Sequence, residues 1–280
     1  MSKVLKAFKI ISYSLLFYVM TFCFIAFFNV SAKVVENIKK SDGVAVTPDK
    51  IKISGNTRLK EKEILLISGL DRKKSWFQID KDKVESYLIS SGWVKNVSVI
   101  KHFPDSISIK IQEYKPAIIV NSIKKTQGER DLYTMWFADS KGIVFKRAFP
   151  GETDISLPFF HIDYDFMDSK KRETKIKIAV DISRLWQESG ICSIRSIRYD
   201  LTRGFSADCE GNSSMTAVIN FGQIGSFKEL EKMKERFFEV SEKLVRDNKW
   251  AGEYIFEKRG EKLRIIVGKV FRNIDRGKNA

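Results

Sequence analysis

The chain has 280 residues, of which 43% are apolar and 30% are charged, and its formal net charge is +15. These proportions exclude an intrinsically disordered chain, and the length suits one small and one larger domain behind an apolar N-terminal segment. The basic residues form short scattered groups rather than one stripe, and the sequence contains no nucleic-acid-binding motif. We therefore expect a solvated basic surface and no nucleic acid among the partners.

An uncharged apolar segment spans residues 10–30 and follows three lysines in residues 1–9. About 20 apolar residues in a helix cross the hydrocarbon layer of a membrane, and flanking lysines favour the cytoplasmic side. We therefore expect a single-pass anchor in the inner (cytoplasmic) membrane, with a short cytoplasmic tail and a periplasmic or otherwise extracytoplasmic remainder. The alternative is a cleaved signal peptide, because Val30-Ser31-Ala32 is similar to a cleavage site, although the apolar segment is longer than such peptides usually have.

A first exported domain is predicted over residues 49–116, after a linker at residues 31–48. Its apolar residues follow period two at both ends of the domain and helical spacing in two segments between. This order, β-α-α-β-β, is enough for a small two-layer α+β domain. The expected elements are a strand at residues 50–54, helices at 58–70 and 79–92, and hairpin strands at 94–103 and 106–113.

The same spacings predict which side chains of this domain are buried. In the second hairpin strand, Ile107, Ile109 and Ile111 share a dry face. The residues that alternate with them face water, namely Ser108, Lys110 and Gln112. The other side chains expected in the core are Leu59, Leu66, Ile67 and Leu70 of the first helix, Val84, Tyr87 and Leu88 of the second, and Trp93, Val97, Val99 and Phe103.

Residues 117–270 are predicted to form a second, larger domain, followed by a tail at residues 271–280. Strands follow one another along this segment and are interrupted by two amphipathic helices, at residues 174–190 and 226–248. We expect an extended antiparallel sheet with the helices on one side. Its strands are expected at residues 118–121, 135–139, 143–147, 194–199, 205–209, 215–221, 252–257 and 262–270.

The sequence offers few groups for chemistry. It contains no nucleophile-elbow, phosphate-loop, zinc-protease or dinucleotide motif, so we expect no enzyme, no catalytic residue and no cofactor. No Cys/His spacing suggests a metal ligand set. Cys192 and Cys209 can pair across a loop of about 17 residues or stay as two buried thiols, and the sequence leaves both open.

One run of residues resembles a known family. GWVKNVSVIKHFPDSISIKIQEYKPA at residues 92–117, with ISGN at residues 53–56, resembles the POTRA domain of the bacterial cell-division family FtsQ, called DivIB in other lineages. The resemblance is strongest over residues 50–117 and weaker after residue 150, and residues 161–173 depart from it. The family pattern D-x-x-G-x-V-F, followed by L-P, is met by Asp139, Gly142, Val144, Phe145, Leu157 and Pro158.

The resemblance implies a non-enzymatic scaffold at the division septum. Its implied partners are division proteins of the FtsB and FtsL type on the exported domains, with FtsK- or FtsW-type proteins on the POTRA and membrane segments. The alternative is an outer-membrane insertion or secretion factor, because POTRA domains also occur in that class. Such factors usually carry a C-terminal barrel of alternating strands, whereas residues 117–270 hold two amphipathic helices and too few strands.

The resemblance also places the partner site on the last two strands and on an arginine that precedes an earlier strand. An outer strand offers unpaired backbone N–H and C=O groups, so we expect a partner strand to add to the sheet. Arg203 and Arg259 suit bidentate contacts with partner carboxylates. The alternative is a closing strand that serves only the core, with solvated arginines. The residues of this predicted site are Arg203, Tyr254, Phe256, Lys258, Arg259, Gly260, Leu263, Arg264, Ile265, Ile266 and Val267.

Overall fold

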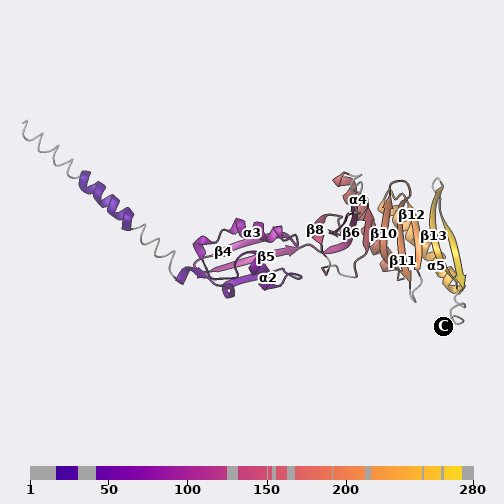
Figure 1. Cartoon of the computed structure of the whole chain (residues 1–280), viewed down its shortest axis with the longest axis horizontal. Coiled ribbons are helices and arrows are strands. Elements are labelled where there is room, and N and C mark those ends of the chain that lie inside the picture. Colours follow the sequence, from indigo (N-terminus) through magenta and orange to yellow (C-terminus); the bar gives the residue numbers. More distant parts are fainter. Residues whose placement is uncertain are drawn as a thin grey trace, which may run out of the picture. The chain divides into compact units, whose positions relative to one another are not determined.

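The computed structural model divides the chain into two units, Met1–Glu113 and Tyr114–Ala280 (Figure 1). The N-terminal segment is described only in part: residues 17–30 are helical, and the rest of the predicted span lies outside the described residues. Among the residues that the structure describes, no helix is both long and apolar enough to cross a membrane. The described residues are 17–30, 42–124, 132–149, 151–152, 156–162, 168–190, 192–211, 216–247, 249–259 and 262–272.

The first unit has the predicted β-α-α-β-β order. Its sheet has the order β2-β5-β4, in which β2 runs parallel to β5 and β4 runs antiparallel to it. A short ladder of β1 and β3 forms a second, two-stranded sheet that the sequence analysis did not predict. The elements are η1 (Asp42–Val44), β1 (Ala45–Val46), η2 (Pro48–Lys50), β2 (Ile51–Ser54), α2 (Glu61–Ile67), β3 (Lys74–Ser75), η3 (Trp76–Gln78), α3 (Lys81–Ser90), β4 (Val94–His102) and β5 (Ser106–Glu113).

The predicted dry face of β5 is confirmed, because Ile107, Ile109 and Ile111 are all buried. Three buried side chains of the helices cover them: Ile64 of α2, and Val84 and Leu88 of α3. Burying side chains of this size stabilises a fold by roughly 1.5–3 kcal/mol each.

Three side chains predicted in this core are exposed instead: Leu66, Tyr87 and Phe103. In α2 the sheet contacts Ile64, and a residue two positions later lies about 200° around the helix, so Leu66 faces solvent. Tyr87 flanks the narrow buried stripe of α3. Phe103 lies in the hairpin turn beyond the last β4–β5 pair, outside the layer between the sheet and α2 and α3.

Glu113, the last residue of β5, binds the loop that follows β2 through its carboxylate. It accepts backbone N–H groups of Thr57, Arg58 and Leu59 at 2.7–3.1 Å, and also the Thr57 hydroxyl. Gly55, at φ +83°, leads into this loop, and a Cβ there would lie 2.1 Å from the carbonyl oxygen of Ile111. Glu113 therefore ties the loop after β2 to the end of β5.

We expect Glu113→Gln to destabilise the first unit at neutral pH and to remove part of its acid sensitivity. Burial raises the pKa of Glu113, but the hydrogen bonds from Arg58, Leu59 and Thr57 outweigh it, so the pKa lies below its ordinary value of 4.5. A lowered pKa stabilises the fold above 4.5, and this contribution disappears as the pH falls through the lowered value. Replacing the charged carboxylate by a neutral amide should lower the free energy of unfolding by on the order of 1 kcal/mol.

Urea unfolding of the full chain at pH 7 and pH 3 measures this effect. The wild-type and variant midpoints should differ at pH 7 and converge at pH 3. The exposed Glu61→Gln serves as a control that removes a charge but no loop contact. A constant difference at both pH values would contradict this role for Glu113.

The second unit is one nine-stranded sheet with two long helices. Its strand order is β14-β13-β12-β11-β10-β9-β6-β7-β8. The elements are β6 (Pro116–Lys124), β7 (Leu132–Asp139), β8 (Val144–Ala148), β9 (Phe159–Ile162), α4 (Ser169–Ser189), β10 (Cys192–Asp200), β11 (Gly204–Gly211), β12 (Thr216–Gly222), α5 (Phe227–Arg246), β13 (Lys249–Arg259) and β14 (Lys262–Arg272).

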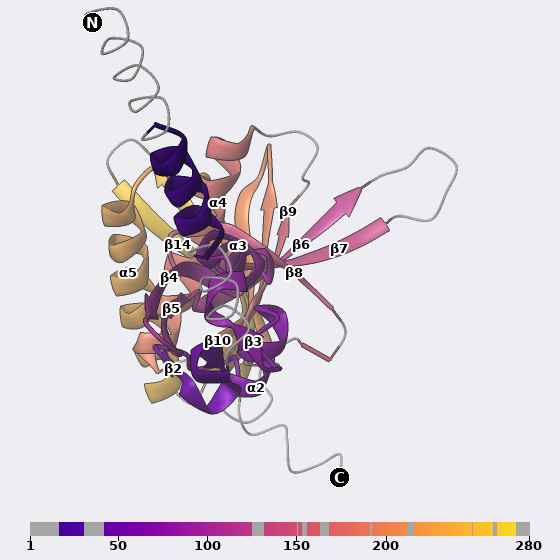
Figure 2. The ribbon, with the colours of Figure 1, turned by 90° about the vertical axis from the view of Figure 1, so that its left-hand side faces the viewer.

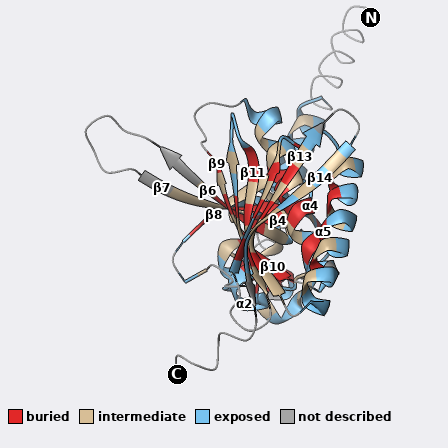
Figure 3. Ribbon diagram, turned by 90° about the vertical axis from the view of Figure 1, so that its right-hand side faces the viewer, coloured by how far each residue is buried: buried red, intermediate tan, exposed pale blue. Residues whose placement is uncertain are grey.

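The prediction of an antiparallel sheet is wrong, because the sheet is mixed. Strand β9 runs parallel to both β6 and β10, and β12 runs parallel to β13. The chain crosses from β9 to β10 through α4 and from β12 to β13 through α5, and a helix in such a connection allows neighbouring strands to be parallel. Both crossovers move the chain toward β14. Because such crossovers are right-handed, both helices lie on the same face of the sheet (Figure 2, Figure 3).

The core of the second unit lies between this face and the two helices, where Figure 3 shows the buried residues in red. Trp186 of α4 packs against Phe221 of β12 and Phe237 of α5, with ring centroids 4.9 and 5.6 Å apart. The Ser226 side chain caps α5 by accepting the N–H of Glu229 at 3.2 Å, as its sequence predicts. Cys192 and Cys209 form a disulfide in this core, with Cα atoms 5.7 Å apart.

The D-x-x-G pattern has a packing reason in the turn between β7 and β8. Buried Asp139 accepts the N–H groups of Lys141 and Ile143 at 2.9 and 3.0 Å. Gly142 has φ +84°, and a Cβ there would lie 2.4 Å from the carbonyl oxygen of Glu173 in α4. Only glycine allows the turn to approach the helix backbone this closely.

Candidate partner-binding edge

Strand β14 lies at one edge of the nine-stranded sheet and pairs only with β13. On the other side of an edge strand, every second residue presents its N–H and C=O to solvent. The backbone of β14 therefore offers a row of donors and acceptors. These groups lie in the segment that the resemblance predicts as the partner site.

Side chains alternate along β14 as the sequence predicts. Leu263, Ile265 and Val267 pack against the core from the inner face. Arg264 and Ile266 point outward, and the Ile266 side chain is 49% exposed. A partner strand added to this edge would therefore meet apolar Ile266 and the basic side chains of Lys262 and Arg264 on the outer face.

Tyr254 and Phe256 do not belong to this surface. Their side chains lie in the core, 0% and 7% exposed, and Tyr254 packs on Phe237 with ring centroids 4.8 Å apart. Their strand, β13, is flanked by β12 and β14, so its backbone is paired on both sides. The sequence identifies a strand but not its neighbours, and this is why both residues were wrongly included.

Lys258 is held at the end of β13 by α5. Its ammonium donates to the carboxylate of Glu229 at 2.7 Å, and the other oxygen of Glu229 accepts the N–H of Gly225 at 3.0 Å. The Lys258 side chain remains 61% exposed. Arg259 is the last residue of β13, and Gly260 lies outside the described residues.

Arg203 lies in the turn between β10 and β11 and is exposed. The carboxylate of Asp200 accepts the N–H of Arg203 and of Thr202, both at 2.8 Å, and the Thr202 hydroxyl. These hydrogen bonds lower the pKa of Asp200 to about 2, and the bond from the Thr202 hydroxyl contributes most to this shift. Gly204 follows at φ +80°, and a Cβ there would lie 2.1 Å from Gly222. The backbone beneath Arg203 is therefore well fixed.

The register brings Arg203 to the same end of the sheet as the β13–β14 turn. Phe205 pairs with Gly222, and β12 runs parallel to β13 with Asn220 opposite Ile255. Glu257 in turn pairs with Arg264. Three strand spacings, about 14 Å, separate the start of β11 from β14. One partner segment can therefore contact both Arg203 and the edge.

The regular edge of β14 is interrupted at Lys269. Glu253 pairs with Gly268 and Ala251 with Val270 in one unshifted register, so Lys269 stands opposite Gly252. Lys269 has φ +50°, a conformation that residues other than glycine rarely adopt. The glycine at residue 268 inside an apolar strand was the sequence signal of a locally weakened strand. The edge available to a partner strand is therefore residues 262–268.

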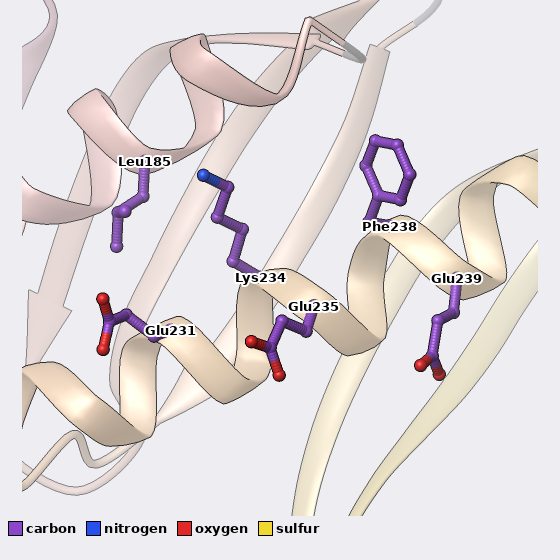
Figure 4. Close-up of a pocket in the computed structure, with 6 residues that line it drawn as sticks. All are labelled: Leu185, Glu231, Lys234, Glu235, Phe238 and Glu239. Atoms are coloured by element: carbon purple, nitrogen blue, oxygen red, sulfur yellow. The ribbon is translucent and has the colours of Figure 1, made fainter.

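Two grooves accompany α5. The first, about 750 Å³, lies beside the edge strand, between α5 and β14. The second, about 530 Å³, lies between α4 and α5, where Lys234 points toward α4 and bridges to Glu188 at 3.7 Å (Figure 4). Only the first adjoins the predicted site. It is lined by Lys232, Glu235, Arg236, Glu239, Lys262, Leu263 and Arg264.

Comparison with known proteins addresses the first unit most directly. The family model "POTRA domain, FtsQ-type" matches residues 46–114, which include β2, both helices, the hairpin and Glu113. Curated relatives named FtsQ or DivIB come from several distant bacteria. Residues 46–114 thus match an FtsQ-type POTRA domain, and the chain is similar to proteins named FtsQ and DivIB.

The FtsQ/DivIB relatives are distant. "Cell division protein FtsQ" of Syntrophotalea carbinolica is 28% identical over 37% of this chain and 33% of that protein. The FtsQ of Geobacter sp. (strain M21) is 24% identical over 56% of this chain and 55% of that protein. "Cell division protein DivIB" of Bacillus cereus is 32% identical over 28% of this chain and 30% of that protein. The chain spans about a third to a half of the length of these relatives.

The β14 edge lies outside the residues that match the POTRA model. Its assignment as a partner site therefore depends on its own geometry. That geometry comprises an open strand edge, alternating side chains, and an arginine fixed at the same end of the sheet.

Proposed function

We propose that this protein is a division scaffold that binds other division proteins at the septum through its exported domains. The FtsQ-type POTRA match and the similarity to proteins named FtsQ and DivIB support a role in cell division. The open edge of β14 is the observation that carries the binding role, because it presents unpaired backbone groups over residues 262–268. In this proposal a partner segment adds a strand to β14, and alternate side chains select the partner.

The proposed organisation follows from the sequence. Residues 1–9 form a cytoplasmic tail, residues 10–30 a single-pass anchor in the cytoplasmic membrane, and the remainder is extracytoplasmic. The POTRA domain over residues 49–116 and the FtsQ-type β domain over residues 117–270 then both face the wall-building machinery. The proposed partners are FtsB- and FtsL-type proteins at β14, and FtsK- or FtsW-type proteins at the POTRA and membrane segments.

Arg203 is proposed to act with the edge. It is exposed, its backbone is fixed, and it lies at the end of the sheet where β14 begins. Its guanidinium suits a bidentate contact with a carboxylate on the same partner segment that pairs with β14.

The test uses two outward-facing variants of the full chain, Arg203→Glu and Ile266→Asp. We expect each to weaken co-purification of the FtsB/FtsL-type pair about tenfold or more, which corresponds to about 1.4 kcal/mol. Lys141→Glu, exposed in the β7–β8 turn at the other end of the strand order, is the matched control and should bind normally. Circular dichroism establishes that all three variants are folded.

A second measurement separates strand addition from contact by side chains alone. Hydrogen exchange of the full chain should slow on partner binding at alternate amides of residues 262–268. Binding that survives both variants in folded proteins, or that leaves these amides unprotected, would overturn the proposal.

A further inference from the structure

Three aromatic side chains gather at one end of the first unit, away from its core. Trp76 and Phe77 come from η3, and Phe103 comes from the turn between β4 and β5. The ring centroid of Trp76 lies 5.3 Å from that of Phe77 and 5.5 Å from that of Phe103. Phe77 is 41% exposed and Phe103 is 65% exposed, so two large rings form an apolar surface in contact with water.

This aromatic cluster is held in place. The ammonium of Lys101 lies 4.1 Å from the ring centroid of Trp76 and donates to the carbonyl of Ile79 at 2.6 Å. Trp76 therefore forms a fixed base, and the two phenylalanine rings stand on it. Rings that project from a fixed base suit insertion into a soft apolar phase, because little side-chain entropy remains to be lost.

Basic residues surround the aromatic cluster. Arg72, Lys73 and Lys74 are exposed, and only Ser75 separates them from Trp76. The basic residues of the surface are Lys50, Arg72, Lys73, Lys74 and Lys101, and the acidic residues beside them are Asp71, Asp80 and Asp105.

Two of the acidic residues are balanced by basic neighbours: Asp71 lies 3.6 Å from Arg72, and Asp105 contacts Lys50. Asp80 accepts the N–H of Asp82 to cap α3. The basic side chains of this surface outnumber its carboxylates, so it carries a net positive charge beside two exposed aromatic rings.

We propose that this surface binds anionic phospholipid. Phe77 and Phe103 would enter the interfacial layer, where aromatic rings are favoured, while Arg72, Lys73 and Lys74 meet lipid phosphates. The basic side chains match the phosphate layer of a lipid surface, and the exposed aromatic rings match the apolar layer beneath it. An acidic protein partner would use the charges but would not require the projecting rings.

The chain also keeps this surface within reach of a membrane. The proposal rests on the predicted anchor at residues 10–30, and residues 31–41 separate this anchor from the first element of the folded domain, η1. Eleven residues span at most about 40 Å, even when fully extended. An anchored first unit therefore stays close to the bilayer, where weak lipid contacts are sufficient for it to dock.

The experiment uses the full chain in lipid nanodiscs, with photoreactive benzoylphenylalanine in place of Phe103. In discs with anionic phosphatidylglycerol, irradiation should yield lipid adducts about fivefold or more above those in discs of phosphatidylcholine alone. The yield should fall at roughly 0.5 M salt, because salt screens exposed charges. The same probe in place of Tyr87, an exposed aromatic of α3, is the matched control and should give few adducts in either lipid.

The variant Arg72→Glu/Lys73→Glu/Lys74→Glu should reduce the adducts at residue 103 to the level in phosphatidylcholine. Circular dichroism checks its fold. Co-elution of the protein with the discs measures membrane anchoring independently of the adducts. A chain that does not co-elute lacks the anchor, whereas a chain that co-elutes without adducts lacks the lipid-binding surface. Adducts no more frequent at residue 103 than at residue 87, adducts unaffected by the charge reversal, or adducts only to protein would each overturn the proposal.

Discussion

Ile109→Asp is expected to unfold the first unit. Ile109 is 1% exposed in the central strand β5, where it pairs with Ile53 on one side and Val99 on the other. A carboxylate at this position has no partner under the helices, and burying it costs several kcal/mol. Because small domains are stable by only about 5–15 kcal/mol, the change removes most of this stability.

Lys110→Asp is the matched control for this prediction. It introduces the same carboxylate one residue later, on the exposed face of the same strand. Hydrogen exchange of the full chain over residues 94–113 should become fast in Ile109→Asp and remain slow in Lys110→Asp. Equal exchange in the two variants would show that the inner and outer faces of β5 are wrongly assigned.

Replacing both cysteines of the disulfide, as Cys192→Ala/Cys209→Ala, is expected to lower the free energy of unfolding of the second unit by about 3 kcal/mol. The two cysteines are 17 residues apart in sequence, and a cross-link of this size restricts the unfolded chain by about that amount. Both cysteines are buried, so the variant also loses packing inside the core. Guanidinium unfolding of the full chain measures the change.

Cys23→Ala provides the control, because Cys23 is exposed and forms no disulfide. Its unfolding should match that of the wild type. Under reducing conditions the wild type should approach the double variant. A wild type that unfolds at the same denaturant concentration with and without reductant would contradict a stabilising disulfide.

The first unit was predictable because its signals are local. Period-two runs and helical spacing each lie within one element. The cap of α3 is local as well, because Asp80 accepts the N–H groups of Asp82 and Lys83. The errors arose where burial depends on what lies opposite. Phe103 is a large apolar residue of the kind that usually lies in a core, but it is exposed in the hairpin turn.

The second unit shows the limit of local signals. Its helices and its other strands were placed nearly correctly, but β9 was not predicted as a strand. The parallel pairs β9–β10 and β12–β13 depend on strands brought together by crossovers. The order strand-helix-strand at α4 and α5 was the available signal. The same limit affected the partner site: the edge position of β14 and the burial of Tyr254 follow from strand order, which no single segment contains.

Strand β9 has a consequence for how the second unit folds. It contributes only Phe159–Ile162, yet it alone joins β6, β7 and β8 to the five strands from β10 to β14. The strands β6, β7 and β8 pair with their neighbours in sequence, as do β10, β11 and β12, so both meanders can form early from nearby contacts. The pairing of β6 with β9 must close a much longer loop, and such closures are slow. The two halves of the sheet should therefore form independently and join last, when this four-residue strand docks between them.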